Sequence, residues 1–189
     1  MTSTPEPMTA EDLERFRAYL NVLARAQVSP ALRDRLDLSG VVQQTLLEAV
    51  RGMSADPRGR TEDEAAAWLR AILGHNLADG LRRLNTQKRD VRRVRSLTAA
   101  LDQSSARLAD CLADGEPSPS RKLIHHERML AVARALEALP ENQRRAVEMH
   151  HLQGMPLAEI AAALGTTRPA VAGLLHRGLK ALRANLDES

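Results

Sequence analysis

The sequence has few cysteines, few aromatic residues and no long apolar runs, and each shortage excludes a class of protein. Cys111 is the only cysteine, so no internal disulfide and no cysteine-based zinc site can form. No apolar run approaches the roughly 18 to 20 residues of a membrane span. Residues 1–7 lack the basic and apolar regions of a signal peptide. We therefore expect a soluble cytoplasmic protein with no membrane partner.

Sequence motifs for catalysis and metal binding are also missing. The chain contains no phosphate-binding glycine loop, no nucleophile elbow and no His-Glu-x-x-His sequence. The pairs His125-His126 and His150-His151 are adjacent in sequence, and neighbours on a helix diverge by about 100°, so neither pair converges on one ion. The sequence predicts no enzyme activity, no metal site and no cofactor.

What the chain does contain is helix-forming sequence. Ala and Leu make up about a third of its 189 residues, whereas the aromatic residues that favour strands number only three, Phe16, Tyr19 and Trp68. We predict an all-α fold of two small helical domains joined by a flexible linker, because 189 residues suit one ordinary domain or two small ones. The predicted parts are a disordered leader (1–8), a first domain (9–100), a linker rich in small and polar residues (101–120) and a second domain (121–189).

Helix boundaries in the first domain follow from capping signals. Thr9 with Asp12 and Thr61 with Glu64 have the spacing of N-terminal capping boxes. Between them we predict a helix from about 39 to 51 that stops at Gly52. The helix that starts at Thr61 should run to about 84, with Trp68 on its apolar stripe as a core anchor.

Positive charge is concentrated in one segment. Seven basic residues between 82 and 95 face a single acid, Asp90, so the segment carries +6 while the whole chain carries +3. Such a segment suits contact with a phosphate backbone, and a solvated helix face is the other interpretation. Because it follows the predicted helix directly, we expect it to extend that helix.

Residues 157–183 have the pattern of a helix-turn-helix. Counted from Leu157, the small residue Ala161 is fifth, Gly165 is ninth and the apolar Val171 is fifteenth. These are the small crossing residue, the turn glycine and the second-helix anchor that the motif requires. Thr167 should cap the second helix. A purely structural helical hairpin is the alternative.

The second helix of this motif would place its first residues against base edges. Arg168 is the expected base reader, since arginine can donate two hydrogen bonds to guanine. Thr166 and Thr167 would contact bases or phosphate, whereas His176, Arg177 and Lys180 suit the DNA backbone. The outward Ala170, Ala172 and Gly173 offer no hydrogen bonds, so we expect sparse readout, with apolar contact to thymine methyl groups, and weak binding by this protein alone.

These motifs together resemble the extracytoplasmic-function (ECF) group of sigma-70-type RNA polymerase sigma factors. Residues 139–144 (LPENQR), 159–161 (EIA), 164–165 (LG) and 171–178 look like sigma region 4. Residues 41–49 (VVQQTLLEA) look like region 2.2, and residues 68–72, 76–79 and 82–83 look like regions 2.3 and 2.4. The order of the motifs, separated by a linker, is more specific than the helix-turn-helix by itself.

The resemblance implies three contact sets and no catalysis by this chain. Docking on the largest subunits of core RNA polymerase would use Val41, Val42, Gln43, Gln44, Leu47 and Glu48. The −10 element and the promoter backbone would be contacted by Asn76, Asp79, Arg82, Arg83, Lys88, Arg89, Arg92 and Arg93. The −35 element would be read by Thr166, Thr167, Arg168, Ala172, His176, Arg177 and Lys180. An anti-sigma factor is a further partner that the sequence neither requires nor excludes.

The chain departs from the family pattern at two places that matter for docking and capping. Gly40 and Gln44 stand where the family usually has acidic residues, which would weaken the docking helix if those acids pair with basic residues of the polymerase. Pro156 stands where a Ser or Thr usually caps the first motif helix. Two other functions therefore stay open, a dimeric helix-turn-helix regulator that binds operators without polymerase and a sigma-like interaction protein that has lost polymerase binding.

Overall fold

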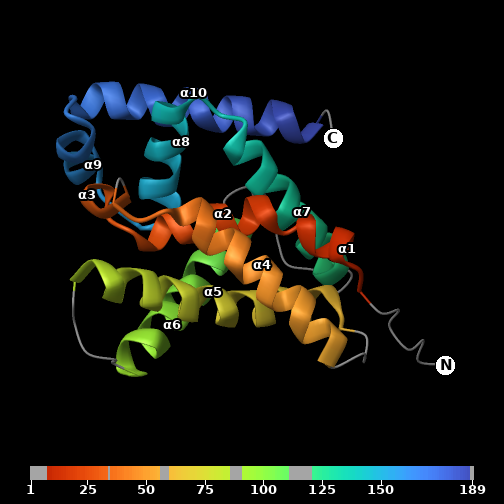
Figure 1. Ribbon diagram of the computed structural model, residues 1–189. Helices are drawn as coiled ribbons and strands as arrows, with labels where there is room; N and C mark the ends of the chain where they lie inside the picture. Colours follow the sequence, from red (N-terminus) through yellow and green to blue (C-terminus); the bar gives the residue numbers. More distant parts are fainter. Residues whose placement is uncertain (1–7, 34, 56–59, 86–90, 111–120, 188–189) are drawn as a thin grey trace. The chain divides into compact units, whose positions relative to one another are not determined.

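The computed structural model describes residues 8–33, 35–55, 60–85, 91–110 and 121–187, and every regular element within them is helical. The all-α prediction is confirmed (Figure 1). Except for Met8, the predicted leader lies outside the described residues. The elements are α1 (Ala10–Glu14), α2 (Arg17–Gln27), α3 (Pro30–Arg33), α4 (Leu38–Ala55), α5 (Glu62–Asn85), α6 (Val91–Asp110), α7 (Arg121–Glu137), α8 (Glu141–Val147), the π-helix η1 (Glu148–Leu152), α9 (Leu157–Leu164) and α10 (Arg168–Asp187).

The chain divides into two compact units, Met1–Asp102 and Gln103–Ser189, and the boundary falls within α6. The first ten residues of the segment predicted as a linker, 101–110, are helical. In the second unit Leu108 is fully buried and Arg107 Nη1 donates a hydrogen bond of 3.0 Å to the carbonyl oxygen of Leu152. Residues 111–120 lie outside the described residues.

Both predicted capping boxes are present in the first unit. The backbone amide of Thr9 donates to Asp12 Oδ2 over 2.8 Å, and the Asp12 amide donates to Thr9 Oγ1 over 3.2 Å. Thr61 and Glu64 form the same reciprocal pair at the start of α5, at 2.8 and 3.3 Å. Hydrogen bonds from the backbone and the threonine side chains lower the pKa of both carboxyl groups, because they stabilise the charged form.

The core of the first unit forms where α2, α4 and α5 pack together, with fully buried Tyr19, Leu69 and Leu73 among its members. The predicted stop at Gly52 is wrong, because α4 continues to Ala55. A Cβ atom on Gly52 would lie 2.7 Å from Trp68 Cζ2, so the glycine admits the indole ring and does not end the helix. Trp68 is half-buried, with the Arg60 guanidinium carbon 4.2 Å from its ring centroid.

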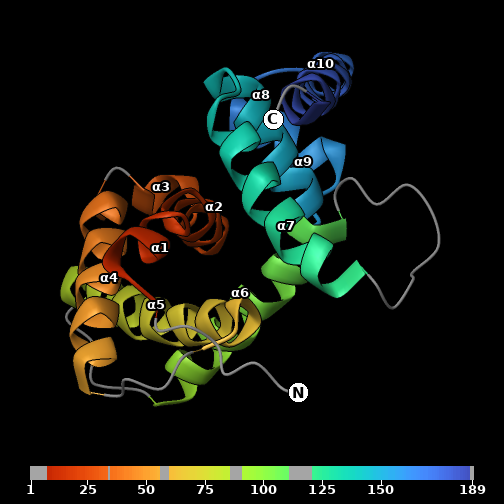
Figure 2. The ribbon, with the colours of Figure 1, turned by 90° about the vertical axis from the view of Figure 1, so that its right-hand side faces the viewer.

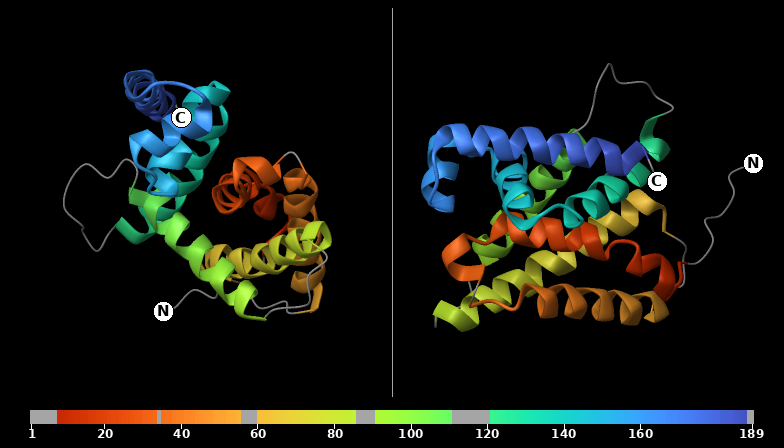
Figure 3. Two further views of the ribbon diagram at one scale, coloured as in Figure 1. Left: turned by 90° about the vertical axis from the view of Figure 1, so that its left-hand side faces the viewer. Right: turned by 90° about the horizontal axis from the view of Figure 1, so that it is seen from above.

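Helix α6 folds back against α5, so the basic segment does not extend α5 as we expected. Arg70 Nε on α5 donates to Asp102 Oδ1 on α6 over 2.6 Å, and Gly74 faces Thr98 Oγ1. Earlier residues of α5 thus meet later residues of α6, which defines an antiparallel helix pair (Figures 2 and 3). The described parts of the basic segment, 82–85 and 91–95, consequently lie at the same end of this helix pair, and residues 86–90 lie outside the described residues.

In the second unit, α10 packs on α7, α8 and α9. Gly178 permits the approach to α8, since a Cβ atom there would lie 2.9 Å from Val147 Cγ2. The π-helix η1 follows α8 directly and carries Glu148, whose side chain is fully buried 4.0 Å from Arg144 Nε. Burial also lowers the pKa of His151, whose Nε2 atom is buried without a hydrogen-bond partner in the described part of the chain.

The described residues contain neither a helix suited to cross a membrane nor a metal-binding cluster. Their helices include none with the length and apolar character needed to cross a membrane. Over the same residues, no set of three or more His, Cys, Asp and Glu side chains is arranged to hold a metal ion.

Candidate nucleic-acid interface

The turn between α9 and α10 is built around Gly165. Its backbone is left-handed, with φ at 62° and ψ at 38°. The Gly165 amide donates to the carbonyl oxygen of Ala162 over 3.3 Å, and the Thr166 amide donates to that of Ala161 over 2.9 Å. This is the Schellman arrangement, which satisfies the last carbonyl groups of a helix and favours glycine at the left-handed position.

The other motif positions also adopt the predicted roles. Ala161 and Val171 are buried, as a crossing residue and an anchor should be. Thr167 Oγ1 accepts a hydrogen bond of 3.3 Å from the Ala170 amide and so caps α10. Pro156 precedes α9 without a side-chain cap, and its carbonyl oxygen accepts from the amides of Glu159 and Ile160. The sequence therefore located this motif correctly, residue by residue.

The outward face of the motif is open. All seven residues predicted to contact the −35 element are exposed: Thr166, Thr167, Arg168, Ala172, His176, Arg177 and Lys180. Within the described residues, the side chains of Arg168, His176 and Lys180 have no hydrogen-bond or ion-pair partner. Their donors are available for a ligand, and the positive dipole at the N-terminal end of α10 suits phosphate.

Arg177 adds a feature that the sequence did not reveal. Its Nη1 atom lies 3.2 Å from the place that a Cβ atom on Gly173 would occupy. The guanidinium thus lies back along α10 toward its N-terminus and covers the position that we took to offer no hydrogen bonds. Helical side chains generally lean toward the N-terminus, and the glycine leaves room for this one.

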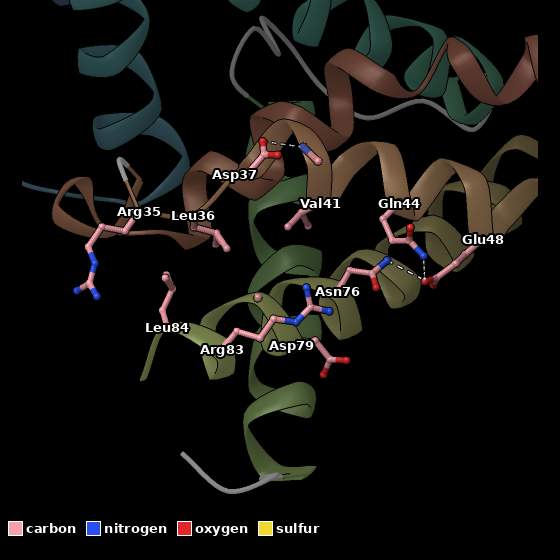
Figure 4. A pocket seen from close by; sticks show the side chains of 12 residues that line it. Arg35, Leu36, Asp37, Val41, Gln44, Glu48, Asn76, Asp79, Arg83 and Leu84 are labelled. Carbon is pink, nitrogen blue, oxygen red and sulfur yellow. Dashed lines mark hydrogen bonds between the residues drawn. The ribbon is translucent and has the colours of Figure 1, made fainter. Parts of the chain in front are cut away.

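In the first unit, a pocket of about 610 Å³ lies between α4 and α5 (Figure 4). It brings together residues to which the resemblance assigns two different roles. Val41, Gln44 and Glu48 come from the predicted polymerase-docking helix, whereas Asn76, Asp79 and Arg83 come from the predicted −10 segment. The two predicted contact sets therefore share one surface.

Polar residues around this pocket are held by internal bonds. Asn76 Nδ2 donates to Thr45 Oγ1 over 3.1 Å and to Glu48 Oε2 over 3.4 Å. Gln44 Nε2 donates to Glu48 Oε1 over 2.7 Å, and Arg82 forms an ion pair with Asp79. Thr45 is fully buried and was not among the predicted site residues, since a lone Thr on a helix gives no signal in the sequence.

The remaining predicted residues of this unit differ in exposure. Gln43 and Gln44 are exposed on α4, and Leu47 is the one large hydrophobic residue classed as exposed in the described part of the chain, at 44%. Val42 is fully buried in the core, so its side chain packs inward and does not face a partner. Arg83 is exposed. Lys88 and Arg89 lie outside the described residues, and Arg92 and Arg93 lie on α6 with side chains outside that description.

The second unit belongs to a known class of DNA-binding module. Residues 129–182 match the family model described as "Sigma-70, region 4". That range runs from α7 through the helix-turn-helix to α10.

Similarity to curated proteins extends over both units. ECF RNA polymerase sigma factor SigF of Caulobacter vibrioides is 32% identical over 171 residues, covering 89% of this chain and 77% of the relative. SigC of Mycobacterium tuberculosis is 27% identical, covering 95% and 80%, and SigL of the same species is 28% identical, covering 82% and 77%. The chain belongs to the ECF RNA polymerase sigma factors. Its role is accordingly that of a transcription initiation factor that associates with RNA polymerase.

Proposed function

We propose that this protein directs core RNA polymerase to promoters with two recognition elements, one for each unit. The first unit docks on the largest polymerase subunits through the outward face of α4 and contacts the −10 element through the end of α5 and the basic segment. The second unit reads the −35 element through α10. The observation that supports this most strongly is the exposure of all seven predicted −35 contacts on a well-formed helix-turn-helix.

Two further observations weigh against a regulator that works without polymerase. A free helix-turn-helix regulator needs no second helical unit like that of sigma factors, yet similarity to SigF covers 89% of this chain. The reading face offers Arg168 and Arg177 but also the apolar Ala170 and Ala172, which carry no side-chain hydrogen-bond donors. Sparse readout of this kind suits a module that polymerase delivers to its site.

Reconstituted transcription tests the proposal. Purified core polymerase, this protein and a library of promoter fragments should yield specific transcripts only when all three are present. Sequencing of the transcribed templates should reveal conserved positions near both −10 and −35. Specific operator binding by a free dimer, with no complex formed on core polymerase, would favour the stand-alone regulator.

A further inference from the structure

Thr45 is a fully buried polar residue on α4, and its hydroxyl group has a defined direction. Thr45 Oγ1 donates a hydrogen bond of 2.8 Å to the carbonyl oxygen of Val41. A hydroxyl group has a single hydrogen, so this bond leaves Oγ1 only its lone pairs for any other partner. Thr45 therefore presents a hydrogen-bond acceptor to its neighbours.

Asn76 of α5 meets this acceptor and a second one. Its Nδ2 atom donates to Thr45 Oγ1 over 3.1 Å and to Glu48 Oε2 over 3.4 Å. The Glu48 side chain is itself held by Gln44, whose Nε2 atom donates to Oε1 over 2.7 Å. An amide nitrogen has two hydrogens, and these two bonds account for both of them.

The same bonds fix which way round the Asn76 amide lies. If the amide were flipped, its carbonyl oxygen would face the Glu48 carboxylate and a hydroxyl group whose hydrogen already bonds to Val41. Neither group could donate to that oxygen, and buried Thr45 would lose the donor that it now has. Because leaving a buried polar group without its partner is costly, the flipped amide is unfavourable.

The carbonyl oxygen Oδ1 is the group that Asn76 leaves for a ligand. Within the described residues it accepts no hydrogen bond, and it is not one of their buried unpaired atoms, so it is open to the pocket that Asn76 lines. Arg83 is exposed and lines the same pocket, and Figure 4 shows its side chain extending in the direction of Asn76. The pocket thus offers an acceptor and a cation, which suit the base and the phosphate of a nucleotide.

We propose that Thr45 is a positioning residue for −10 recognition that acts through Asn76. Its hydroxyl group holds the amide so that the acceptor Oδ1, and not the amino group, faces the DNA. Asn76 then binds a base through the exocyclic amino group of cytosine or adenine, a group that thymine lacks. The bidentate contact of asparagine with adenine is excluded, because it needs a donor that Asn76 has already used. This inference rests on the proposed contact of the first unit with the −10 element.

The first test uses equilibrium binding of the wild-type holoenzyme to labelled promoter fragments. Each adenine of the −10 element is replaced in turn by purine, and each cytosine by pyrimidinone, so that only the amino group is lost. We expect affinity to fall about threefold to tenfold at the position that Asn76 contacts, as for one lost hydrogen bond. In the Asn76→Ala holoenzyme the same replacement should have no effect, which identifies that position and its base.

The second test changes Thr45 itself. Thr45→Val removes the hydroxyl group with little change in size, whereas Thr45→Ser keeps it. Thr45→Val should lose most of the discrimination between the normal and the analogue promoter, and Thr45→Ser should retain it. Added to Asn76→Ala, Thr45→Val should have no further effect on promoter binding, because the residue through which it acts is gone. Urea unfolding of each variant measures separately what the hydroxyl group contributes to stability.

The outcomes distinguish this inference from the function on which it rests. Equal weakening by Thr45→Val on normal and analogue promoters would show a purely structural role and overturn it. The inference also fails if no −10 position responds both to loss of the amino group and to Asn76→Ala, a result that does not depend on whether Thr45→Val folds. Failure of the wild-type protein to form a holoenzyme, or of that holoenzyme to recognise any −10 sequence, would instead contradict the proposed function.

Discussion

The pocket region of the first unit and the outward face of α10 in the second unit differ in how their polar side chains are used. Around the pocket of the first unit, Asn76, Glu48 and Asp79 are all engaged in bonds within the unit. On α10 of the second unit, Arg168 and Lys180 have no such partners among the described residues. The first surface is held in place by its own polar residues, whereas the second keeps its donors for a ligand.

This difference has a consequence for substitutions. A change at Asn76 of the first unit should lower stability, because its bonds to Thr45 and Glu48 join α5 to α4. A change on the outward face of α10 should alter DNA binding alone. Four substitutions test whether the two regions separate in this way.

The contact between α8 and α10 leaves no room for a larger side chain at Gly178. Gly178→Val should lower the free energy of unfolding by about 2 to 3 kcal/mol, because the added side chain meets buried Val147 where even a Cβ atom is crowded. Urea unfolding followed by circular dichroism measures this. Gly173→Ala on the same helix is the control, since it faces only the movable end of Arg177 and should cause no loss. Equal losses for both would show that α10 does not pack through Gly178.

Arg168→Ala should change DNA recognition without changing the fold. We expect a loss of about 1 to 3 kcal/mol in holoenzyme binding to the preferred −35 sequence and relaxed specificity at one base pair. Because the side chain is exposed and unpaired within the described residues, unfolding should shift by less than about 0.5 kcal/mol. Binding assays on a set of −35 variants measure both the loss of affinity and the change in specificity. Uniform weakening on every variant would show that Arg168 contacts phosphate only.

Asn76→Ala, in contrast to Arg168→Ala, should lower the stability of the folded protein. It removes the donor that joins α5 to Thr45 and Glu48 of α4, so the first unit should lose about 1 kcal/mol of stability. Gln43→Ala, an exposed change on α4, is the matched control and should leave the unfolding midpoint unchanged. If Asn76→Ala reduced promoter binding with no loss of stability, Asn76 would act as a direct DNA contact in the same sense as Arg168.

His151 should make the second unit modestly sensitive to acid. Burial lowers its pKa in the folded state below the ordinary value of 6.5. The unfolded chain therefore takes up the proton first, so the stabilising contribution is complete above pH 6.5 and is lost as pH falls from there toward the folded-state pKa. Urea midpoints at pH 7.5 and 5.5 should differ less in His151→Leu than in wild type. An identical pH dependence in both proteins would contradict this role.

Local sequence signals predicted those parts of the fold that depend on bonds between residues close together in the chain. The capping pairs Thr9–Asp12 and Thr61–Glu64 and the turn at Gly165 were found because their bonds join residues within a few positions. The exposed positions of the helix-turn-helix followed from its spacing. For the same reason the exposure of the seven candidate −35 residues was predictable from sequence.

The features that the sequence did not predict depend on tertiary contacts. Gly52 was predicted as a helix stop. The glycine is instead required because the ring of Trp68, sixteen residues later, occupies the space that a side chain at position 52 would need. The antiparallel contact of α6 with α5 includes the Arg70–Asp102 ion pair, which nothing in the local pattern predicts. Such features depend on contacts between residues that are distant in the sequence, which local patterns do not reveal.

We propose that the two units recognise a promoter jointly and only on polymerase. Footprinting of one promoter with the protein alone, core polymerase alone and the two combined tests it most directly. We expect protection over both the −10 and −35 elements in the combined sample and none with the protein alone at the same concentration. Protection of the −35 element by the free protein, equal to that of the combined sample, would contradict it.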